Sequence, residues 1–396
     1  MSVLAGQSVL VTGGTGFLGS RVVEKLVLEH EARVRVLTSN LARASRAARF
    51  DIELVLGDVG DADLVRRVAK GCNVIVHCAY GSRGSEAERR RVTVDGTRAV
   101  LDAALAVRAQ RVVHVSTMVV YGIGVEGVLD ERAPRRRTGI GYADTKREAE
   151  ALVDRYARER GAPVTIVQPT AIYGPYAPSW TERVVEAMRT RRLILVDGGE
   201  GLANPVYVDD VADALLLAAV RNEAVGETFL VASGERVTWR EFLGRYEAML
   251  GEGATVAMTR AEAKTYFARQ QRRAWLLGEL RSAVLRDSDL RRRLLKTREL
   301  DALMRVARPL LATKALRPLV HRLRPAKGAR KVTAGLPKPI QAEHPKQVDF
   351  LAAKTEVSID KARRLLGFEP AFGLDAGMAL TEAYLRWANR LPTEEE

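Results

Sequence analysis

Apolar and polar residues follow one another in blocks along the first half of the chain. Continuous apolar runs, suited to strands, occupy Ser8–Thr12, Arg33–Leu37, Ile52–Leu56, Val74–Cys78, Val112–Val115 and Val164–Val167. Stretches with helical spacing lie between them at Arg21–Leu28, Asp61–Ala69, Asp95–Ala106 and Thr145–Glu159. A strand that is apolar throughout is normally covered on both faces. The alternation therefore predicts an α/β protein with a doubly wound parallel sheet.

The pattern becomes irregular beyond about residue 170. Pro175, Pro178 and the glycine-rich run Gly198–Gly201 indicate loops, the kind of segment that commonly contacts substrates. We therefore expect a nucleotide-binding core with a smaller C-terminal substrate region and a helical insertion. The predicted bounds are 1–170 for the core, 171–254 for a substrate-side region interleaved with it, 255–346 for the insertion and 347–396 for helices that complete the substrate region.

Two helices are expected near the C-terminus. Ser358 has the side chain of an N-cap, Ile359–Leu366 has helical spacing, and Gly367 follows as a stop signal. A second, amphipathic helix is expected near Met378–Asn389.

Composition indicates a globular protein that remains in the cytoplasm. Of the 396 residues, 47% are hydrophobic and 28% are charged, and no window holds 18 uninterrupted apolar residues. The first apolar run has no basic segment before it and leads into a glycine turn, which favours a strand over a signal peptide. Cys72 and Cys78 flank the run CNVIVHC, where we expect buried free thiols.

The net charge of +14 is concentrated in one segment. Between Arg260 and Lys346 there are 23 Lys or Arg residues and 7 Asp or Glu residues, so the rest of the chain carries a small negative charge. Apolar positions at helical spacing predict basic helices there, and examples are Leu300, Leu303, Met304, Leu310 and Leu311.

Three interpretations of residues 260–346 stay open. The segment is a solvated helical lid or a subunit surface, as in a homodimer, or it attaches the protein peripherally to an anionic membrane. The third is nucleic-acid binding, but the scarcity of aromatic residues disfavours sequence-specific recognition.

A glycine-rich turn follows the first predicted strand. Gly13, Gly16 and Gly19 are spaced as G-x-x-G-x-x-G between a strand and a helix. The first glycines permit a tight turn and close approach to a pyrophosphate, and the N–H groups at the helix start favour an anion. The turn predicts a Rossmann-type site for NAD(H) or NADP(H).

The end of the second strand favours NADP(H). NAD-specific sites commonly place an acid there for the ribose 2′-hydroxyl, whereas this chain reads Leu37-Thr38-Ser39-Asn40 with Arg43 following. Thr38 and Arg43 are candidate contacts for a 2′-phosphate, although Arg43 also fits a solvated helix residue. Asp58, after the third run, is equally suited to capping the next helix and to binding the adenine amine.

Tyr142 and Lys146 are spaced by four residues, so on a helix they share one face. A phenol with an ordinary pKa of about 10 is a poor acid or base at neutral pH, and a nearby ammonium stabilises its ionised form. Ser116 and Thr117 end a predicted strand upstream, where a hydroxyl could hold a substrate oxygen. These residues form a candidate catalytic set.

The chain resembles the extended short-chain dehydrogenase/reductases, or NAD-dependent epimerase/dehydratases. The resemblance rests on TGGTGFLG, GDV, VIVHCAY, VSTMVVYG, YADTK, QPTAIYGP and VYVDDVA, in this order. It implies that Tyr142 is the general acid/base, that Lys146 also binds the nicotinamide ribose and that Thr117 orients the reacting oxygen. Further candidate cofactor contacts in these motifs are Thr15, Phe17, Leu18, Val59, Ala79, Pro169 and Ile172.

The chain departs from that family's pattern on the substrate side. Similar dehydratases carry an Asp-Glu pair after the active hydroxyl, where this chain has Met118-Val119. Many sugar-nucleotide epimerases place an arginine where Ala203 stands. These differences shift the prediction towards a less charged alcohol or ketone. The candidate substrate-side residues are Tyr176, Trp180 and Asn204, although a core or loop-packing role is favoured for each of them.

The histidines are scattered without metal-ligand spacing, so no metal is implied. We expect His77 and His114, which lie in strand runs, to be core residues. The sequence thus predicts an NAD(P)-dependent oxidoreductase that acts on a secondary alcohol or ketone. Two alternatives are an epimerase that retains its cofactor and a non-catalytic dinucleotide-binding scaffold.

Overall fold

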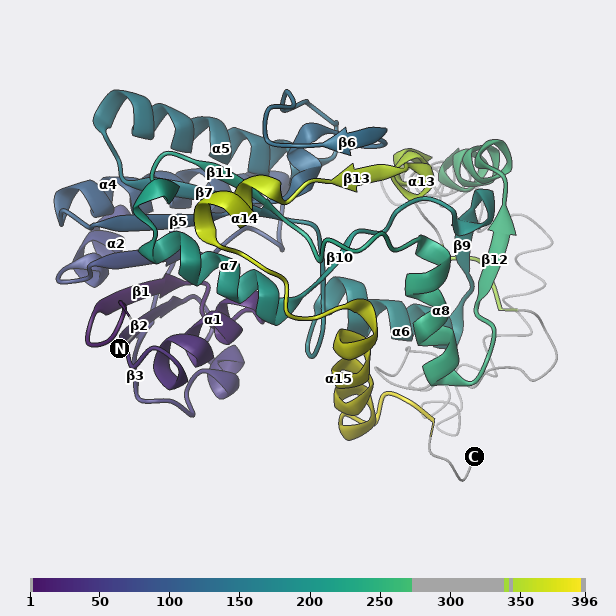
Figure 1. Ribbon diagram of the computed structural model, residues 1–396, viewed down its shortest axis with the longest axis horizontal. Coiled ribbons are helices and arrows are strands. Elements are labelled where there is room, and N and C mark those ends of the chain that lie inside the picture. Colours follow the sequence, from purple (N-terminus) through teal and green to yellow (C-terminus); the bar gives the residue numbers. More distant parts are fainter. Residues whose placement is uncertain (1–2, 273–337, 342–344, 393–396) are drawn as a thin grey trace, which may run out of the picture.

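The computed structural model describes residues 3–272, 338–341 and 345–392. Its centre is a parallel sheet of seven strands in the order β11-β7-β5-β4-β1-β2-β3 (Figure 1). The strands are β1 (Ser8–Thr12), β2 (Arg33–Thr38), β3 (Ile52–Leu56), β4 (Val74–His77), β5 (Arg111–Val115), β7 (Val164–Pro169) and β11 (Thr228–Val231). The order reverses between β1 and β4, which is where doubly wound sheets bind their ligands.

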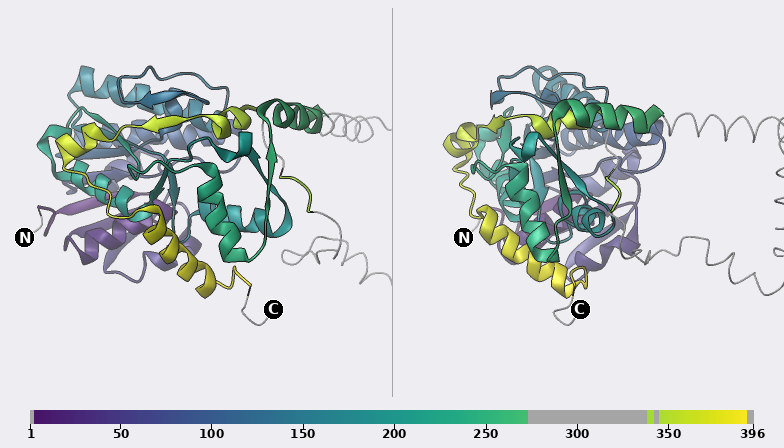
Figure 2. Two further views of the ribbon diagram at one scale, coloured as in Figure 1. Left: turned by 45° about the vertical axis from the view of Figure 1, so that its right-hand side comes forward. Right: turned by 90° about the vertical axis from the view of Figure 1, so that its right-hand side faces the viewer.

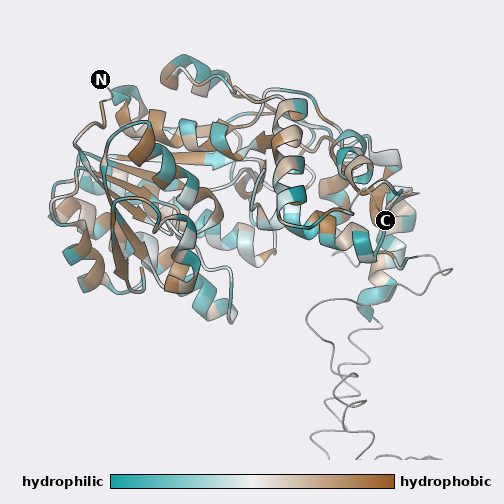
Figure 3. Cartoon of the chain, turned by 90° about the horizontal axis from the view of Figure 1, so that it is seen from below, coloured by the Kyte–Doolittle hydropathy of each residue, from teal (hydrophilic) through white to brown (hydrophobic). Residues whose placement is uncertain are grey.

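Helices cover both faces of this sheet, as the continuous apolar runs predict. Val9 and Val11 pack with α1 (Phe17–Leu28) and α7 (Val208–Val220). Leu10, which points the other way, packs with the opposite layer. That layer consists of α2 (Ala62–Ala69), α4 (Gly96–Ala106) and α5 (Gly141–Arg160). The strands are accordingly coloured as hydrophobic between more polar helices (Figure 3).

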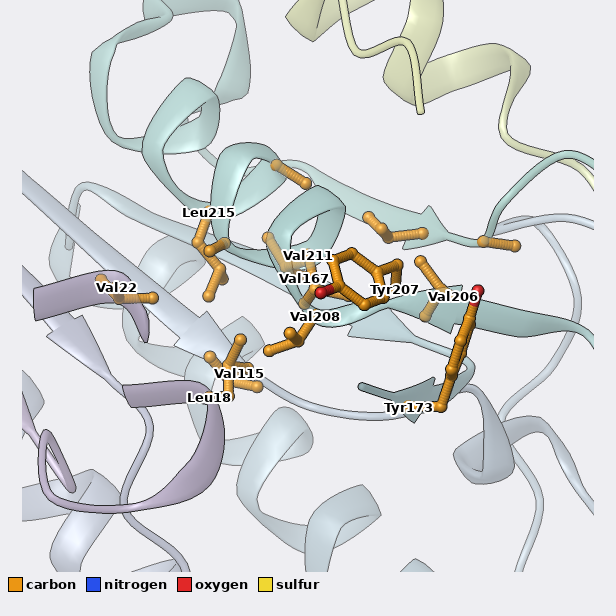
Figure 4. Close-up of a cluster of buried hydrophobic side chains, with 14 of the residues drawn as sticks. Leu18, Val22, Val115, Val167, Tyr173, Val206, Tyr207, Val208, Val211 and Leu215 are labelled. Carbon is orange, nitrogen blue, oxygen red and sulfur yellow. The ribbon is translucent and has the colours of Figure 1, made fainter. Parts of the chain in front are cut away.

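The first helix layer joins the glycine turn to the rest of the core. Leu18 and Val22 of α1 face Val208, Val211 and Leu215 of α7 across the ends of β5 and β7 (Figure 4). Arg21 and Asp209 add a bidentate ion pair between the same helices, at 2.6 and 2.7 Å. The position of α1 is therefore set by a helix almost two hundred residues later in the chain.

A second lobe lies at the carboxyl ends of the sheet strands. It contains β8 (Ala171–Tyr173) paired with β10 (Pro205–Tyr207), and β9 (Leu193–Val196) paired with β12 (Thr255–Met258). Its helices are α6 (Arg183–Thr190), α8 (Trp239–Leu250), α13 (Pro345–Ala352) and α15 (Leu374–Trp387). The chain returns to the sheet through α7 and β11, and β6 (Gly127–Leu129) pairs with β13 (Thr355–Val357).

Several shorter elements lie between these strands and helices. They are α3 (Glu86–Arg90), α14 (Asp360–Leu366) and the helical turns η1 (Leu41–Arg46), η2 (Arg91–Asp95), η3 (Met118–Tyr121), η4 (Pro178–Glu182), η5 (Asp197–Gly199) and η6 (Asn222–Ala224).

Several predicted helix boundaries need correction. The helix expected at Thr145–Glu159 begins at Gly141, so Tyr142 and Lys146 do lie on one helix. Ser358 is not the N-cap of α14, because Ile359 takes that position, although the Ser358 hydroxyl still accepts a hydrogen bond from the Asp360 N–H at 3.3 Å. Gly367 ends α14 in the left-handed conformation, as predicted. The last helix, α15, starts at Leu374, earlier than the expected Met378.

Both ends of the basic segment are anchored on the second lobe. A helix spans residues 260–272 beside the second lobe (Figure 2). Its Ala263 and Phe267 belong to one buried cluster with Ile194 and Val196 of β9. At the other end, the Arg192 N–H donates to the Pro339 carbonyl at 2.9 Å. The predicted basic helices around Leu300–Leu311 lie outside the described residues.

Across the described ranges, no helix is long and apolar enough to span a membrane.

Candidate active site

The glycine turn has the geometry of a pyrophosphate cradle. Gly13 has a φ of +70°, and a Cβ added there would lie 2.8 Å from the backbone nitrogen of Ala79. A Cβ on Gly19 would lie 2.3 Å from the Gly13 carbonyl oxygen. The N-cap of α1 is Gly16, and no side chain caps the helix, so the first N–H groups are available to an anion. These features fit the phosphates of a dinucleotide.

The residues at the end of β2 divide into buried and exposed groups. The Thr38 hydroxyl is buried and shares a 2.8 Å hydrogen bond with the Thr15 hydroxyl. Asn40 caps η1 by accepting from the Ala42 N–H at 2.9 Å. Ser39 and Arg43 are exposed. The structure therefore gives Thr38 a role in shaping the turn and leaves Ser39 and Arg43 facing solvent at this strand end.

Asp58 does not cap α2, which corrects one of its two predicted roles. Asp61 caps this helix itself, accepting from the Leu64 N–H at 3.0 Å. Asp58 instead accepts from the Gly60 N–H at 2.8 Å and pairs with Arg91, whose guanidinium lowers the pKa of the carboxyl. The neighbouring Val59 is buried among the residues packed on α4.

Thr117, Tyr142 and Lys146 come together at the carboxyl ends of β4 and β5. Lys146 is 3% exposed and its Nζ donates to the Val115 carbonyl at 2.8 Å. Thr117 is buried, and its hydroxyl acts on the Tyr142 phenol. Tyr142 is 46% exposed, so one side of its ring stays reachable. The arrangement brings a hydroxyl, a phenol and an ammonium to one edge of the sheet.

The electrostatics of this set differ from the simple expectation. Although the Tyr142 side chain is half-exposed, the surrounding protein desolvates it and raises its pKa, as does Tyr80, and Thr117 offsets this only in part. Burial lowers the pKa of Lys146 to about 8, although Cys78 and Glu150 act in the opposite direction. The phenol in the protein alone is therefore a weaker acid than free tyrosine.

Tyr80 is a residue of this site that the sequence analysis missed. Its ring meets the Tyr142 ring edge-on at 5.8 Å, and the Lys146 ammonium lies 5.3 Å from the Tyr80 ring centre. Tyr80 is 43% exposed and follows Ala79, which packs on the glycine turn. An aromatic residue directly after a predicted cofactor contact was the available signal.

Comparison with known proteins identifies the family. A sequence model described as the NAD dependent epimerase/dehydratase family matches residues 9–232. The chain belongs to this family. It is therefore an enzyme of the NAD(P)-dependent oxidoreductase and epimerase class, and its cofactor is a nicotinamide dinucleotide.

Relatives within this family catalyse different reactions. A ketoreductase for 4-hydroxy-2-methyl-3-oxo-4-farnesyl-3,4-dihydroquinoline-1-oxide from Stigmatella aurantiaca is 35% identical over 237 residues, covering 59% of this chain and 70% of the ketoreductase. A dTDP-glucose 4,6-dehydratase from Streptomyces niveus is 31% identical over 271 residues, covering 62% and 78%.

A solved structure supports the same fold. The dTDP-glucose 4,6-dehydratase DesIV from Streptomyces venezuelae, with NAD bound, superimposes with a TM-score of 0.65 at 22% identity over 96% of this chain and 97% of DesIV.

The candidate substrate-side residues of this epimerase/dehydratase family member all make packing contacts. The Tyr176 ring lies 4.3 Å from the Tyr384 ring and is covered by Arg46 at 4.1 Å. Trp180 packs on Trp239, with ring centres 5.2 Å apart. The Asn204 amide donates to the Thr355 carbonyl at 2.9 Å. These contacts join the second lobe internally and to η1.

The nicotinamide-side candidates lie where the sheet meets the second lobe. Pro169 ends β7 and is buried, and Ile172 in β8 is half-buried. They follow Gln168, a buried residue that bonds to α5. The reacting end of a dinucleotide that runs from the glycine turn past Lys146 would approach these residues.

His77 and His114 are core residues, as expected. Both are buried, and His77 shares hydrogen bonds with Thr12 at 2.7 Å and with Thr97 at 3.0 Å. Burial lowers the pKa of His77 to about 3, so it is neutral at physiological pH. Cys72 and Cys78 are free thiols, but only Cys72 is buried as expected, and Cys78 is half-buried. Within residues 3–272, 338–341 and 345–392, no group of three His, Cys, Asp or Glu side chains is placed to hold a metal ion.

Proposed function

We propose that this enzyme transfers a hydride between NADP(H) and a secondary alcohol or ketone on a largely apolar substrate. The observation that carries the proposal is the neighbourhood of Thr117. Met118, which follows it, is buried and apolar, and Val119 is also apolar. Elimination of water needs a second acid/base pair, whereas hydride transfer needs one proton donor or acceptor beside the reacting oxygen. Tyr142 supplies that single group.

Each residue has a defined task in this proposal. A bound nicotinamide donates or accepts the hydride. Thr117 holds the substrate oxygen, and Tyr142 gives it a proton during reduction or removes one during oxidation. Lys146 stabilises the tyrosinate and binds the nicotinamide ribose, so its charge is needed while the proton moves.

NADP(H) is the proposed cofactor because β2 ends without an acid. Ser39 and Arg43 present exposed hydroxyl and guanidinium groups there, and a charge-assisted hydrogen bond to a 2′-phosphate contributes about 1.5–3 kcal/mol. We expect Arg43→Ala to weaken NADPH binding about tenfold or more and to leave NADH binding unchanged. Equal affinity of the unaltered enzyme for the two cofactors would indicate NAD(H) instead.

The substrate class is proposed from two independent features. The Stigmatella relative acts on a ketone that carries a farnesyl chain. The basic segment adds a strongly positive region whose described ends are anchored on the second lobe, away from β1, β2 and β3 (Figure 1). Basic side chains near an anionic leaflet contribute about 1 kcal/mol each. Peripheral attachment would bring the enzyme to a membrane-held substrate.

Vesicle flotation tests the membrane contact. The protein should float with phosphatidylglycerol vesicles at low salt and be released by high salt, and it should not float with neutral phosphatidylcholine vesicles. Flotation that persists after residues 273–337 are replaced by a short linker would contradict the role given to the basic segment.

The reaction itself is tested on purified protein. Cofactor released by denaturation is identified by chromatography, and a panel of apolar ketones is screened for stoichiometric NADPH oxidation. Tyr142→Phe should reduce the rate by about 10²–10⁴-fold, the usual contribution of a general acid. Tightly held NAD with substrate turnover but no net cofactor consumption would show an epimerase. A Tyr142→Phe variant with every activity intact would instead favour the scaffold.

A further inference from the structure

The proposed reaction assigns no task to the buried carboxylate of Glu150. Glu150 lies on α5, one helical turn beyond Lys146 and two beyond Tyr142, and it is 0% exposed. An ionised side chain is costly to bury unless it has charged or hydrogen-bonding partners. Its contacts therefore indicate what it does.

Glu150 is the centre of a buried polar network beneath the candidate active site. Arg135 places its Nε 2.6 Å from the Glu150 carboxylate. Gln168 donates its amide to the same carboxylate at 2.8 Å, and the Tyr121 hydroxyl donates to the Gln168 amide oxygen at 2.7 Å. Burial raises the pKa of the Glu150 carboxyl, and the ion pair with Arg135 and the hydrogen bond from Gln168 oppose this shift and favour the charged carboxylate.

This network joins the elements that carry the candidate catalytic residues. Tyr121 ends η3, which begins immediately after Thr117. Gln168 belongs to β7 and directly precedes Pro169 on the nicotinamide side. Glu150 shares α5 with Tyr142 and Lys146. The Glu150 carboxylate therefore links α5 to β7 and, through Gln168 and Tyr121, to η3.

Glu150 also compensates the charge of Lys146. The ionisable groups that act on this ammonium or lie beside it are Cys78, His77, His114, Tyr80 and Glu150. Burial raises the pKa of Cys78 to about 12 and lowers the pKa of both histidines, so these groups are neutral near pH 7. Glu150 is thus the anion in this set, and it raises the pKa of Lys146.

We propose that Glu150 is a positioning residue that keeps Lys146 charged and fixes α5 against β7 and η3, so that cofactor binding and proton transfer extend to alkaline pH. The proposal rests on the function proposed above, because it assigns the Lys146 ammonium to the bound cofactor and to Tyr142.

The test measures NADPH binding by fluorescence between pH 6 and 9.5, which requires no substrate. Binding to the unaltered enzyme should weaken as Lys146 loses its proton, and this pH dependence should disappear in Lys146→Met. In Glu150→Gln the midpoint should fall by about one pH unit, the effect of losing a nearby opposite charge. Binding just above the new midpoint should then be several-fold weaker.

Asp154→Asn is the matched control. Asp154 also pairs with Arg135, but it is partly exposed and does not act on Lys146. Glu150→Gln and Asp154→Asn both remove a partner of Arg135. A difference between their midpoints of NADPH binding therefore reports the effect on Lys146. Glu150→Asp retains the charge and should restore the midpoint even where the shorter side chain loses Gln168. This variant also provides the measurement if Glu150→Gln does not fold.

The outcomes separate the two proposals. An unaltered enzyme that binds neither NADPH nor NADH would overturn the proposed function and, with it, this inference. Binding with the same midpoint in Glu150→Gln as in the unaltered enzyme would overturn the inference alone. An equal shift in Asp154→Asn, or no recovery in Glu150→Asp, would also show that Glu150 acts only through the stability of the fold.

Discussion

Replacement of Gly13 by alanine tests the cradle most directly. Gly13 has a φ of +70°, and the added Cβ would lie 2.8 Å from the Ala79 nitrogen and 2.9 Å from the Ala79 Cα. Both are backbone atoms, so the contact cannot be relieved by turning a side chain. The left-handed conformation costs an alanine about 1–2 kcal/mol, and overpacking adds about 1–3 kcal/mol. We expect Gly13→Ala to lower the free energy of unfolding by about 2–5 kcal/mol.

Gly6→Ala is the matched control for this substitution. Gly6 has nearly the same φ, +68°, but a Cβ there would meet no atom within 4 Å. It should therefore cost only the conformational strain, about 1–2 kcal/mol. The difference between the two variants isolates the close approach of the turn to Ala79.

The assay combines urea unfolding with NADPH titration. If the added Cβ displaces the turn, NADPH will bind more weakly. Each tenfold rise in Kd corresponds to about 1.4 kcal/mol. We expect at least a tenfold rise for Gly13→Ala and none for Gly6→Ala. Equal destabilisation by the two substitutions would refute the close approach to Ala79, and unchanged NADPH affinity in Gly13→Ala would refute the assignment of the turn as the pyrophosphate site.

Three further predictions concern single side chains. Asn204 has a φ of +45° and its amide donates a hydrogen bond to the Thr355 carbonyl. In urea unfolding, Asn204→Gly should lower the free energy of unfolding by about 1 kcal/mol for the lost hydrogen bond, and Asn204→Ala by about 2–3 kcal/mol because alanine also strains the backbone. Lost activity at unchanged stability would point to a substrate contact instead. Tyr80 raises the pKa of Tyr142, so Tyr80→Phe should move the Tyr142 limb of the pH–rate profile to lower pH. A limb at the same pH in both proteins would show that Tyr80 does not affect the pKa of Tyr142. Folding lowers the pKa of Lys146 from 10.5 to about 8, so between pH 8 and pH 10.5 the unfolded chain binds more protons than the folded protein. In this pH range the free energy of unfolding of the unaltered protein should therefore rise relative to that of Lys146→Met. A constant difference between the two proteins from pH 7 to pH 10.5 would contradict the burial of a charged Lys146.

The parallel sheet and the glycine turn could be predicted from local sequence. Leu10 and Val11 of β1 are buried on opposite faces, so the strand must be apolar throughout, and this leaves a continuous run in the sequence. The backbone of Gly13 must take a positive φ beside Ala79, which requires glycine. Both signals arise because a local backbone conformation restricts the residues that can occupy it.

Residue roles on the substrate side depend on partners distant in the chain. Asn204 contacts Thr355, and Tyr176 contacts both Arg46 and Tyr384. Asp58 was open to two roles until the structure placed Arg91 beside it and Asp61 at the helix start. No spacing within the sequence specifies such pairs, because the intervening chain has to fold first.

The sequence by itself determined the nucleotide-binding fold, the position of the glycine turn and the shared helix face of Tyr142 and Lys146, because each depends on backbone geometry within a few residues. The tertiary structure decided the electrostatics of that face. Burial lowers the pKa of Lys146 and raises that of Tyr142, and Glu150 acquires its role only when Arg135 and Gln168 enclose it. Desolvation and charge pairing depend on every element around a group, so they exist only in the folded chain.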